Sequence, residues 1–428
     1  MSLKSCPKSV SFGKTSAPVS DISLLVHGQG VFLFESRDTS CIFSLCDKTK
    51  TNGLQIKLTD TEIFVNRIPD DEPLIDKNNR TGLTTNDGAY YWFSLDSQNQ
   101  ILQAGIGEAR TETAIYRFQF TFDGKEEAES NKKFLESLVS ISIPSVVRLK
   151  PIRLLRDPIT ATVPLVVKNI HELTMNHIAR GTYMPVAAMS PMAQRLYKCI
   201  AGKNFILDND DFPDFSKAIE YSIATPGLWC NTRLKEKSRE FNKDKPDPTE
   251  TYLRITLNEN NGESPGIPYV MEIWPVGHFS PIHNHAGATA VIRVLHGKID
   301  VSLFPYLCCQ KNTIEPFGIS QFVKDDITWI SPTLNQTHQL KNAATSSETC
   351  ITIQCYMYEE DNEIHYDYFD YIDADGNKQQ YEPDSDMDFI SFKEQMRMEW
   401  EAMPRPTTKA SRFLRSILDG IKKLLKIN

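Results

Sequence analysis

Two blocks of short apolar runs, with turn residues between the runs, constrain the fold of this chain most strongly. The runs are rich in β-branched and aromatic side chains, which favour strands over helices. The first block extends from about residue 22 to 122 and the second from about 252 to 381. Turn dipeptides such as Asn52-Gly53 and Asp87-Gly88 separate runs of the first block. We therefore expect a mainly β protein built from two β units.

The two blocks predict two different β architectures. Residues 18–125 are typical of an antiparallel β-sandwich with an interaction role, and residues 191–390 of a small barrel or jelly roll preceded by helical segments. Residues 126–190 are punctuated by proline without clear periodicity and predict a helical or irregular bridge. Residues 1–17 predict a flexible lead-in, and residues 391–428 a basic helical tail.

Composition and charge exclude several functional classes. The chain has 47 basic and 55 acidic side chains, and its net charge of −8 argues against a general nucleic-acid binder, which needs a basic face. No apolar run approaches the roughly 18 residues of a membrane span, and the first residues lack the apolar core of a signal peptide. The nine cysteines are scattered and form no Cys-x-x-Cys pair, so we expect reduced thiols in a cytoplasmic protein.

Residues 409–428 form a pattern of their own. They carry six basic side chains and one acidic side chain, a local charge of +5. Their apolar side chains recur at helical spacing, at Leu414, Ile417, Leu418, Ile421, Leu424 and Leu425. A basic amphipathic helix can lie on an anionic membrane surface, occupy the groove of a protein partner or pack against its own protein. The sequence leaves these three interpretations open.

Three histidines in the second block predict a metal site. His283 and His285 lie on one face of a strand, because side chains repeat every second residue. His338 lies much further along the chain and would come from another strand. Three imidazoles without thiolates suit iron, copper, nickel or zinc, and coordination positions that stay open are typical of a catalytic site.

The residues around these histidines resemble the two motifs of the cupin superfamily. The first motif is matched by Gly277, His283, His285 and Gly297. The end of the second motif is matched by Pro332, His338 and Asn342. In cupins these motifs place metal ligands inside a double-stranded β-barrel. Most cupins have a metal-binding glutamate where this chain has Thr289 or Ala290, which indicates a subset with three histidine ligands.

Within that subset, residues 252–381 resemble the cysteine dioxygenases. Tyr252-Leu253-Arg254 is similar to the family's Tyr-x-Arg, and residues 274–285 to its Trp-x-x-Gly-His-x-Ser-x-Ile-His-x-His. Tyr356 corresponds to the tyrosine beside the metal. The resemblance implies Fe(II) held by the three imidazoles, and a reaction of dioxygen with a small-molecule thiol, L-cysteine or a close analogue, to give the sulfinate.

The resemblance also implies a role for each of the other site residues. Arg254, with Tyr252 beside it, would bind the substrate carboxylate through a planar guanidinium that stays charged. Tyr356 would be the catalytic side chain that reaches dioxygen. Three further side chains would surround these groups without binding the metal: Trp274, Thr352 and Gln354.

Two departures from the family pattern leave alternatives open. Ala290 stands where the animal enzymes carry a cysteine that cross-links to the tyrosine, so no thioether can form there. Gln354 stands where the family has the histidine of a Ser-x-His-x-Tyr relay, and an amide cannot pass a proton as an imidazole does. One alternative is a catalytically silent cupin that serves as a structural, ligand-sensing or partner-binding module. Another is a dioxygenase for a thiol that lacks the carboxylate.

The first block resembles a different family. Residues 91–95 and 101–107 are similar to the Trp-Ile-x-Trp and Ile-x-x-Gly-x-Gly segments of farnesoic-acid-methyltransferase-like β-sandwich modules. Gly105 and Gly107 do not form a dinucleotide-binding loop, because no third glycine follows and a strand comes next. The resemblance implies a binding or interaction role with an unidentified ligand, and not methyl transfer.

Overall fold

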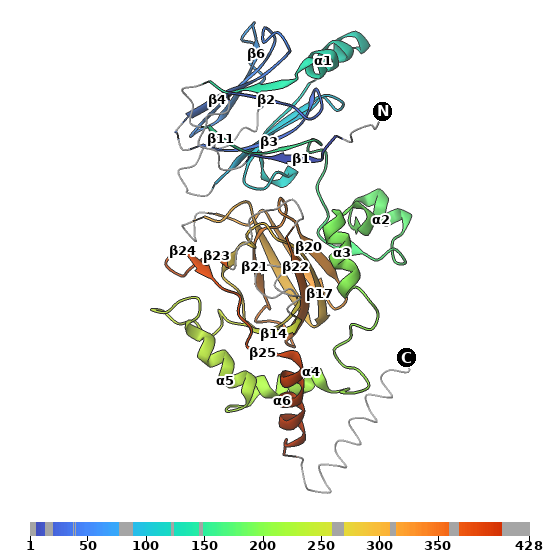
Figure 1. The fold of residues 1–428 in the computed structure, drawn as a ribbon, viewed down its shortest axis with the longest axis vertical. Helices are drawn as coiled ribbons and strands as arrows, with labels where there is room; N and C mark the ends of the chain where they lie inside the picture. Colours follow the sequence, from blue (N-terminus) through green and yellow to red (C-terminus); the bar gives the residue numbers. More distant parts are fainter. Residues whose placement is uncertain are drawn as a thin grey trace.

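The computed structural model describes most of the chain in ten segments. They are residues 6–12, 20–36, 38, 40–76, 89–120, 124–144, 149–258, 269–308, 314–358 and 368–404. Figure 1 shows a sandwich at one end, a barrel in the middle and helices at the other end. In the part of the chain that the structure describes, no helix has both the length and the apolarity needed to cross a membrane.

The N-terminal unit consists of two facing antiparallel sheets. The six-stranded sheet has the order β1 (Ser9–Ser11), β11 (Leu149–Leu155), β3 (Gln29–Ser36), β7 (Tyr91–Asp96), β8 (Ile101–Ile106) and β9 (Ala114–Gln119). The five-stranded sheet has the order β2 (Asp21–Ser23), β10 (Ser140–Ser142), β4 (Ser40–Cys46), β5 (Gly53–Thr59) and β6 (Ile63–Ile68). Alternate side chains of the facing strands fill the core, where the ring of Phe43 packs against those of Phe32, Phe34 and Phe93.

The sandwich is larger than the sequence indicates. β1 lies in the predicted flexible lead-in, and α1 (Lys125–Ser137), β10 and β11 lie in the predicted bridge, yet all three strands pair within the sandwich. The strand character of β11 is hidden because Pro151 interrupts its apolar pattern. The register shifts between Pro151 and Arg153, a bulge that lets the strand accommodate a residue without a backbone N–H. The sandwich sheets therefore include strands beyond the predicted boundary at residue 125.

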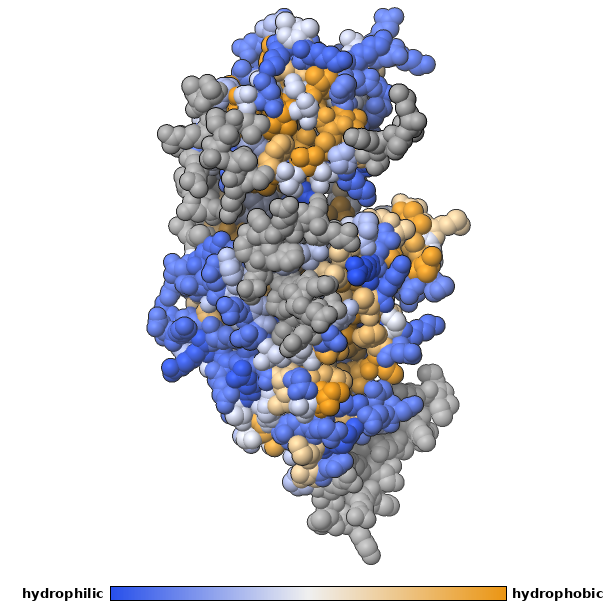
Figure 2. Space-filling model, in the orientation of Figure 1, coloured by the Kyte–Doolittle hydropathy of each residue, from blue (hydrophilic) through white to orange (hydrophobic). Residues whose placement is uncertain are grey.

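A set of short elements connects the sandwich to the barrel. They are β12 (Val167–Lys168), α2 (Met175–Arg180), β13 (Met184–Pro185), α3 (Pro191–Ile200), α4 (Phe215–Ala224) and α5 (Trp229–Glu236). Single turns of 3₁₀ helix occur at Thr111–Thr113, Val186–Ala188 and Lys237–Arg239. Around α2, Figure 2 shows apolar side chains on the surface, and Met175 there is 88% exposed.

The second unit is a barrel of two facing, mostly antiparallel sheets. One has the order β13, β12, β20 (Ile327–Ile330), β17 (Thr289–His296), β22 (Cys350–Met357), β15 (Tyr269–Trp274), β14 (Leu253–Asn258) and β25 (Met387–Asp388). The other has the order β19 (Gly318–Val323), β18 (Lys298–Phe304), β21 (Thr337–Lys341), β16 (Ile282–His283), β23 (Phe369–Ile372) and β24 (Lys378–Tyr381). This alternation of strands between two sheets is a jelly roll, so the predicted mainly β fold with a C-terminal barrel is confirmed.

The last described helix, α6 (Phe389–Glu401), is part of the barrel unit rather than the start of a tail. Asp388 caps it by accepting a hydrogen bond from the backbone N–H of Ser391. Phe392 and Met396 are fully buried, and the ring of Phe392 packs against Phe215 of α4. α6 thus crosses the predicted boundary at residue 390, and apolar residues on one of its faces complete the core. The predicted basic helix over residues 409–428 lies outside the described residues.

Candidate metal centre

The strand register brings the three predicted histidines together. β16 and β21 are antiparallel neighbours, and His283 lies directly opposite His338 in their ladder. His285 follows His283 by two residues and lies on the same side. One ring nitrogen from each imidazole lies within 4.8 Å of the others, and the Nε2 atoms of His285 and His338 are 3.2 Å apart. Among the described residues this is the only such cluster of metal-ligating side chains.

Backbone carbonyls fix which ring nitrogen of two histidines bears the proton. Nδ1 of His283 donates to the carbonyl of Pro281 at 3.0 Å, and Nδ1 of His338 donates to the carbonyl of Asn335 at 2.9 Å. A neutral imidazole has one proton, so Nε2 of each ring presents a lone pair. Because these Nε2 atoms face the same point as His285, the tautomers are those that a shared cation requires.

Burial keeps all three imidazoles neutral. It lowers the pKa of His283 to about 3, with the neighbouring His338 adding to the shift. It lowers the pKa of His338 to about 4, although the bond to Asn335 acts in the opposite direction. For His285, burial and the two other histidines hold the pKa well below its usual value. A neutral imidazole already has an unprotonated nitrogen, so these histidines can bind a metal without first releasing a proton.

The separation of the rings fits a first-row transition metal. Metal–imidazole bonds of about 2.0–2.1 Å place adjacent ligand nitrogens roughly 2.8–3.4 Å apart, from octahedral to tetrahedral geometry, and the 3.2 Å between His285 and His338 falls in that interval. A set of three neutral nitrogens leaves the cation's full charge to be balanced by other ligands. These three residues could therefore hold a metal with open positions, which is the arrangement of a catalytic site.

A buried ion pair lies beside the histidines. Arg254 on β14 lies directly opposite Glu272 on β15, and its Nη1 donates to Glu272 Oε1 at 2.9 Å. Burial opposes the positive charge of Arg254, but the Glu272 carboxylate more than offsets it, and the pKa of Arg254 is raised. Among the described residues, Nε of Arg254 has no hydrogen-bond partner. Arg254 is therefore at the site, but part of its fork is already bound to a carboxylate of the protein.

Glu272 also binds the residue that replaces the family's relay histidine. Gln354 Nε2 donates to Glu272 Oε2 and, at 3.3 Å, to Thr352 Oγ1. The pKa of Glu272 is raised, because burial outweighs the opposing effects of Arg254 and Gln354. No sequence motif identified Glu272. The available signal was a single carboxylate within the apolar run of β15, opposite the arginine that the family motif singles out.

The hydroxyl of Tyr356 is directed at Gln354. It donates a hydrogen bond to Gln354 Oε1, and the phenol ring stacks on His285 with ring centroids 5.3 Å apart. Burial and the Glu272 carboxylate raise the pKa of Tyr356 well above its usual value, so the phenol stays protonated. Ala290 lies directly opposite Tyr356 on β17, where its methyl group offers no sulfur to cross-link.

Aromatic rings form the rest of the wall. Tyr252 stacks on Trp274 with centroids 4.1 Å apart, and Phe369 contacts His285 at 4.4 Å. The sequence analysis did not single out Phe369. One buried cavity is lined by the histidines, the ion pair, Gln354, Tyr356 and these rings.

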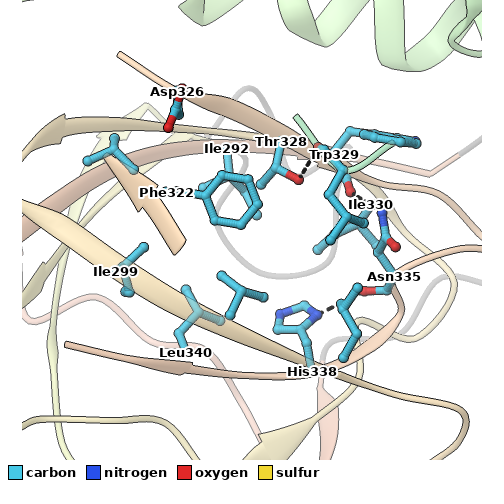
Figure 3. A pocket seen from close by; sticks show the side chains of 14 residues that line it. Ile292, Ile299, Phe322, Asp326, Thr328, Trp329, Ile330, Asn335, His338 and Leu340 are labelled. Carbon is cyan, nitrogen blue, oxygen red and sulfur yellow. Dashed lines mark hydrogen bonds between the residues drawn. The ribbon is translucent and has the colours of Figure 1, made fainter. Parts of the chain in front are cut away.

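A second cavity, lined mainly by apolar side chains, also has His338 in its wall. Figure 3 shows His338 at its wall with Leu340 beside it, and Phe322 across the space. His338 and Leu340 line both cavities. The predicted metal ligand His338 therefore belongs to the wall that the polar and the apolar cavity share.

No family model matches the chain. One similar solved structure is the cupin domain of an XRE family transcriptional regulator from Enterobacter cloacae, with 15% identity, coverage of 22% of this chain and 81% of that chain, and a TM-score of 0.17. Two others are a cupin 2 domain-containing protein from Halorhodospira halophila (13% identity, 38% of this chain, 90% of that chain, TM-score 0.19) and an L-ribose isomerase from Cellulomonas parahominis (12% identity, 32% of this chain, 74% of that chain, TM-score 0.22). The barrel has the cupin fold. That assignment rests on its strand order and on the pairing of β16 with β21.

Proposed function

We propose that the barrel is a mononuclear iron dioxygenase that converts a small thiol to its sulfinate. The observation that carries the proposal is the convergence of three neutral imidazoles beside the buried wall of Arg254, Glu272, Gln354 and Tyr356. Fe(II), if bound by the three imidazoles, would supply the redox chemistry for joining dioxygen to sulfur. The reaction balances as RSH + O2 → RSO2H, with the sulfur losing four electrons and dioxygen gaining four.

The protein's own residues would hold and orient the reactants. The polar cavity is small and its walls are buried, so a bound thiol excludes water from the site. Tyr356 stays protonated and can donate only one hydrogen bond, which Gln354 accepts in this structure. Gln354 neither gains nor releases a proton, so we assign Tyr356 an orienting role in place of a proton relay.

The choice of substrate depends on Arg254. L-Cysteine, which the family resemblance implies, needs the guanidinium for its carboxylate. With Nη1 bound to Glu272, a substrate carboxylate could bind bidentately only through Nε and Nη2, directly beside the Glu272 carboxylate. A substrate carboxylate would also face the charge of Glu272 in a buried site. These contacts favour a thiol without a carboxylate as the substrate, with L-cysteine as the competing candidate.

Oxygen uptake by the iron-loaded full chain tests the proposal. We would supply cysteamine, L-cysteine and 3-mercaptopropionate in turn and detect the gain of two oxygen atoms by mass spectrometry. We expect one dioxygen per thiol consumed, fastest with cysteamine, and loss of uptake in His338→Ala. If protein with full iron occupancy consumes no dioxygen with any of the three thiols, the dioxygenase proposal fails.

A catalytically silent cupin is the second candidate. It is favoured by the bond between the Tyr356 hydroxyl and Gln354, which turns that hydroxyl toward an amide that cannot titrate. In this case the wild-type protein would bind a metal and a ligand without turnover. Binding of cysteamine to the metal-loaded protein, measured by calorimetry with no oxygen uptake, would distinguish this candidate from the enzyme.

A further inference from the structure

The segment between β8 and β9 of the sandwich reaches into the barrel unit. Gly107 adopts a left-handed conformation with φ of +78°, and a Cβ atom there would lie 1.9 Å from the carbonyl oxygen of Pro305. The next residue, Glu108, donates its backbone N–H to that carbonyl at 2.8 Å. Only glycine allows the two backbones to approach this closely, so residue 107 is adapted to a contact between the two units.

Two charged side chains follow this glycine and are buried in the contact. Glu108 Oε1 accepts a hydrogen bond from the backbone N–H of Gln336 at 2.7 Å. Arg110 Nη1 donates to the side-chain oxygen of Asn335 at 2.9 Å, and its guanidinium lies over the ring of Phe317 at 4.9 Å. Both charged residues are only 2% exposed. The sandwich thus binds two consecutive residues of the barrel through both backbone and side chain.

These two barrel residues control the third histidine. The carbonyl of Asn335 accepts the Nδ1–H of His338, the bond that fixes its tautomer. Asn335 has a positive φ of +63°, a left-handed conformation that asparagine adopts more readily than most non-glycine residues. Its side-chain amide also donates to the carbonyl of Trp329 at 2.9 Å, which leaves its oxygen free to accept from Arg110.

Gln336 links this segment to the backbone that follows His285. Its side-chain Nε2 donates to the carbonyl of Ala288 at 2.8 Å, and its Oε1 accepts from the N–H of Gly287 at 3.0 Å. Gly287 and Ala288 follow His285 closely in the sequence. The backbone that carries His338 and the backbone that carries His285 are therefore joined at Gln336, whose own N–H is held by Glu108.

We propose that Glu108 and Arg110 of the sandwich are positioning residues for the metal centre in the barrel. They hold the backbone of residues 335–336, and that backbone orients His338 and ties it to the segment after His285. Loss of outer partners of metal ligands commonly weakens metal binding by about 10–100-fold. The proposal gives the sandwich a direct role in the barrel's chemistry, and it does not depend on which reaction the barrel catalyses.

The test uses Co(II) binding by the full chain, freed of metal beforehand with a chelator. Calorimetry gives the affinity, and the visible absorption bands of Co(II) report the ligand geometry. Arg110→Met keeps most of the side chain over Phe317 but removes the bond to Asn335. We expect it to weaken Co(II) binding about tenfold and to change the visible bands. Glu108→Gln replaces one oxygen and is expected to weaken binding a few-fold.

Arg67→Met is a matched control within the sandwich. Arg67 donates to the side-chain oxygen of Asn131 at 2.7 Å and lies over the ring of Phe134 at 4.7 Å, so it makes the same two kinds of contact as Arg110. We expect this variant to lose stability in thermal unfolding yet bind Co(II) with wild-type affinity and spectrum.

The outcomes separate positioning from general stability. If folded Arg110→Met and Glu108→Gln both bind Co(II) like the wild type, with unchanged bands, the proposal is overturned. It is also overturned if Arg67→Met weakens Co(II) binding as much as Arg110→Met does. Should Arg110→Met fail to fold, Arg110→Lys decides, because it keeps the positive charge beside Glu108 and removes the guanidinium bond to Asn335.

Discussion

At the scale of single residues, Glu272 distinguishes this site from a simple carboxylate-binding pocket. It is bonded to Arg254 on one side and to Gln354 on the other, and all three are buried. The family resemblance assigns the Arg254 guanidinium to the substrate carboxylate. In this structure a carboxylate of the protein, that of Glu272, is bonded to the guanidinium instead. Removing either partner of the Arg254–Glu272 pair would leave an isolated buried charge, which would lower the free energy of unfolding by several kcal/mol.

Removing the charge of Glu272 should shift substrate preference toward carboxylates. In Glu272→Gln the amide can still accept from Arg254, but it no longer neutralises the guanidinium. We expect the ratio of kcat/KM for L-cysteine to that for cysteamine to rise about tenfold or more, since an ion pair to the substrate becomes available. Glu399→Gln is the control, because Glu399 is a buried glutamate of α6 that bonds to the backbone of Trp229. An unchanged ratio in Glu272→Gln would show that Arg254 does not select the substrate.

Restoring a titratable group beside Tyr356 should raise the rate. In Gln354→His the imidazole can accept the phenol proton and return it, which general acid–base catalysis typically rewards with about 10²–10⁴-fold. We expect faster oxygen uptake and a new dependence of kcat on pH between about 5 and 8, where histidine titrates. A variant with wild-type kcat and a flat pH profile would mean that the phenol proton is not transferred in the rate-limiting step.

At the scale of elements, α6 stabilises the barrel from outside its sheets. Phe392 packs against the rings of Phe215 on α4 and Trp229 on α5, so one side chain joins three helices. Other residues of α6, including Ile390, face solvent. The helix therefore acts through one apolar face.

Truncating that face should destabilise the protein strongly. We expect Phe392→Ala to lower the free energy of unfolding by about 3–5 kcal/mol, because it leaves a cavity among packed rings. Ile390→Ala on the same helix is the control, with an expected change within about 0.5 kcal/mol, since Ile390 is 71% exposed. Urea unfolding followed by circular dichroism measures both. Similar losses in the two variants would contradict the packing described here.

At the scale of the whole molecule, the two units meet at buried charges rather than at an apolar surface alone. Burial raises the pKa of Glu108 to about 7, although Arg110 and the N–H groups of Asn335 and Gln336 favour its charged form. The carboxyl group of Glu108 therefore stays protonated up to a higher pH in the folded protein than in the unfolded chain.

This shift makes stability depend on pH in a defined direction. The folded pKa of Glu108 lies above its unfolded value of 4.5, so its protonated form stabilises the fold at low pH. That stabilisation decreases as the pH rises from about 4.5 to about 7, and the free energy of unfolding does not change further from this cause above pH 7. The total loss in the free energy of unfolding is roughly 3 kcal/mol, at 1.36 kcal/mol per pKa unit. We expect the wild type to lose stability relative to Glu108→Gln over this interval in urea titrations at pH 5, 6, 7 and 8. Parallel pH curves for the two proteins would contradict the raised pKa.

The two β units and the three histidines could be predicted because both depend on local periodicity. Alternation along the strand places His283 and His285 on one side, whatever the rest of the chain does. β11 was missed because Pro151 breaks the same periodicity, and its bulge is visible only against β3. α6 was assigned to a tail because its partners in α4 and α5 are far away in sequence.

By itself, the sequence determined which groups are available: imidazoles at strand spacing, an arginine and a tyrosine in ordered motifs, and a glycine between β8 and β9. Only the tertiary structure decided how these groups are paired. Glu272 neutralises Arg254 because two strands meet in one register, and Arg110 reaches Asn335 across 225 residues of sequence because the sandwich packs on the barrel. Side-chain order along a strand is a local property, whereas hydrogen bonds between strands and between units depend on how the whole chain is folded.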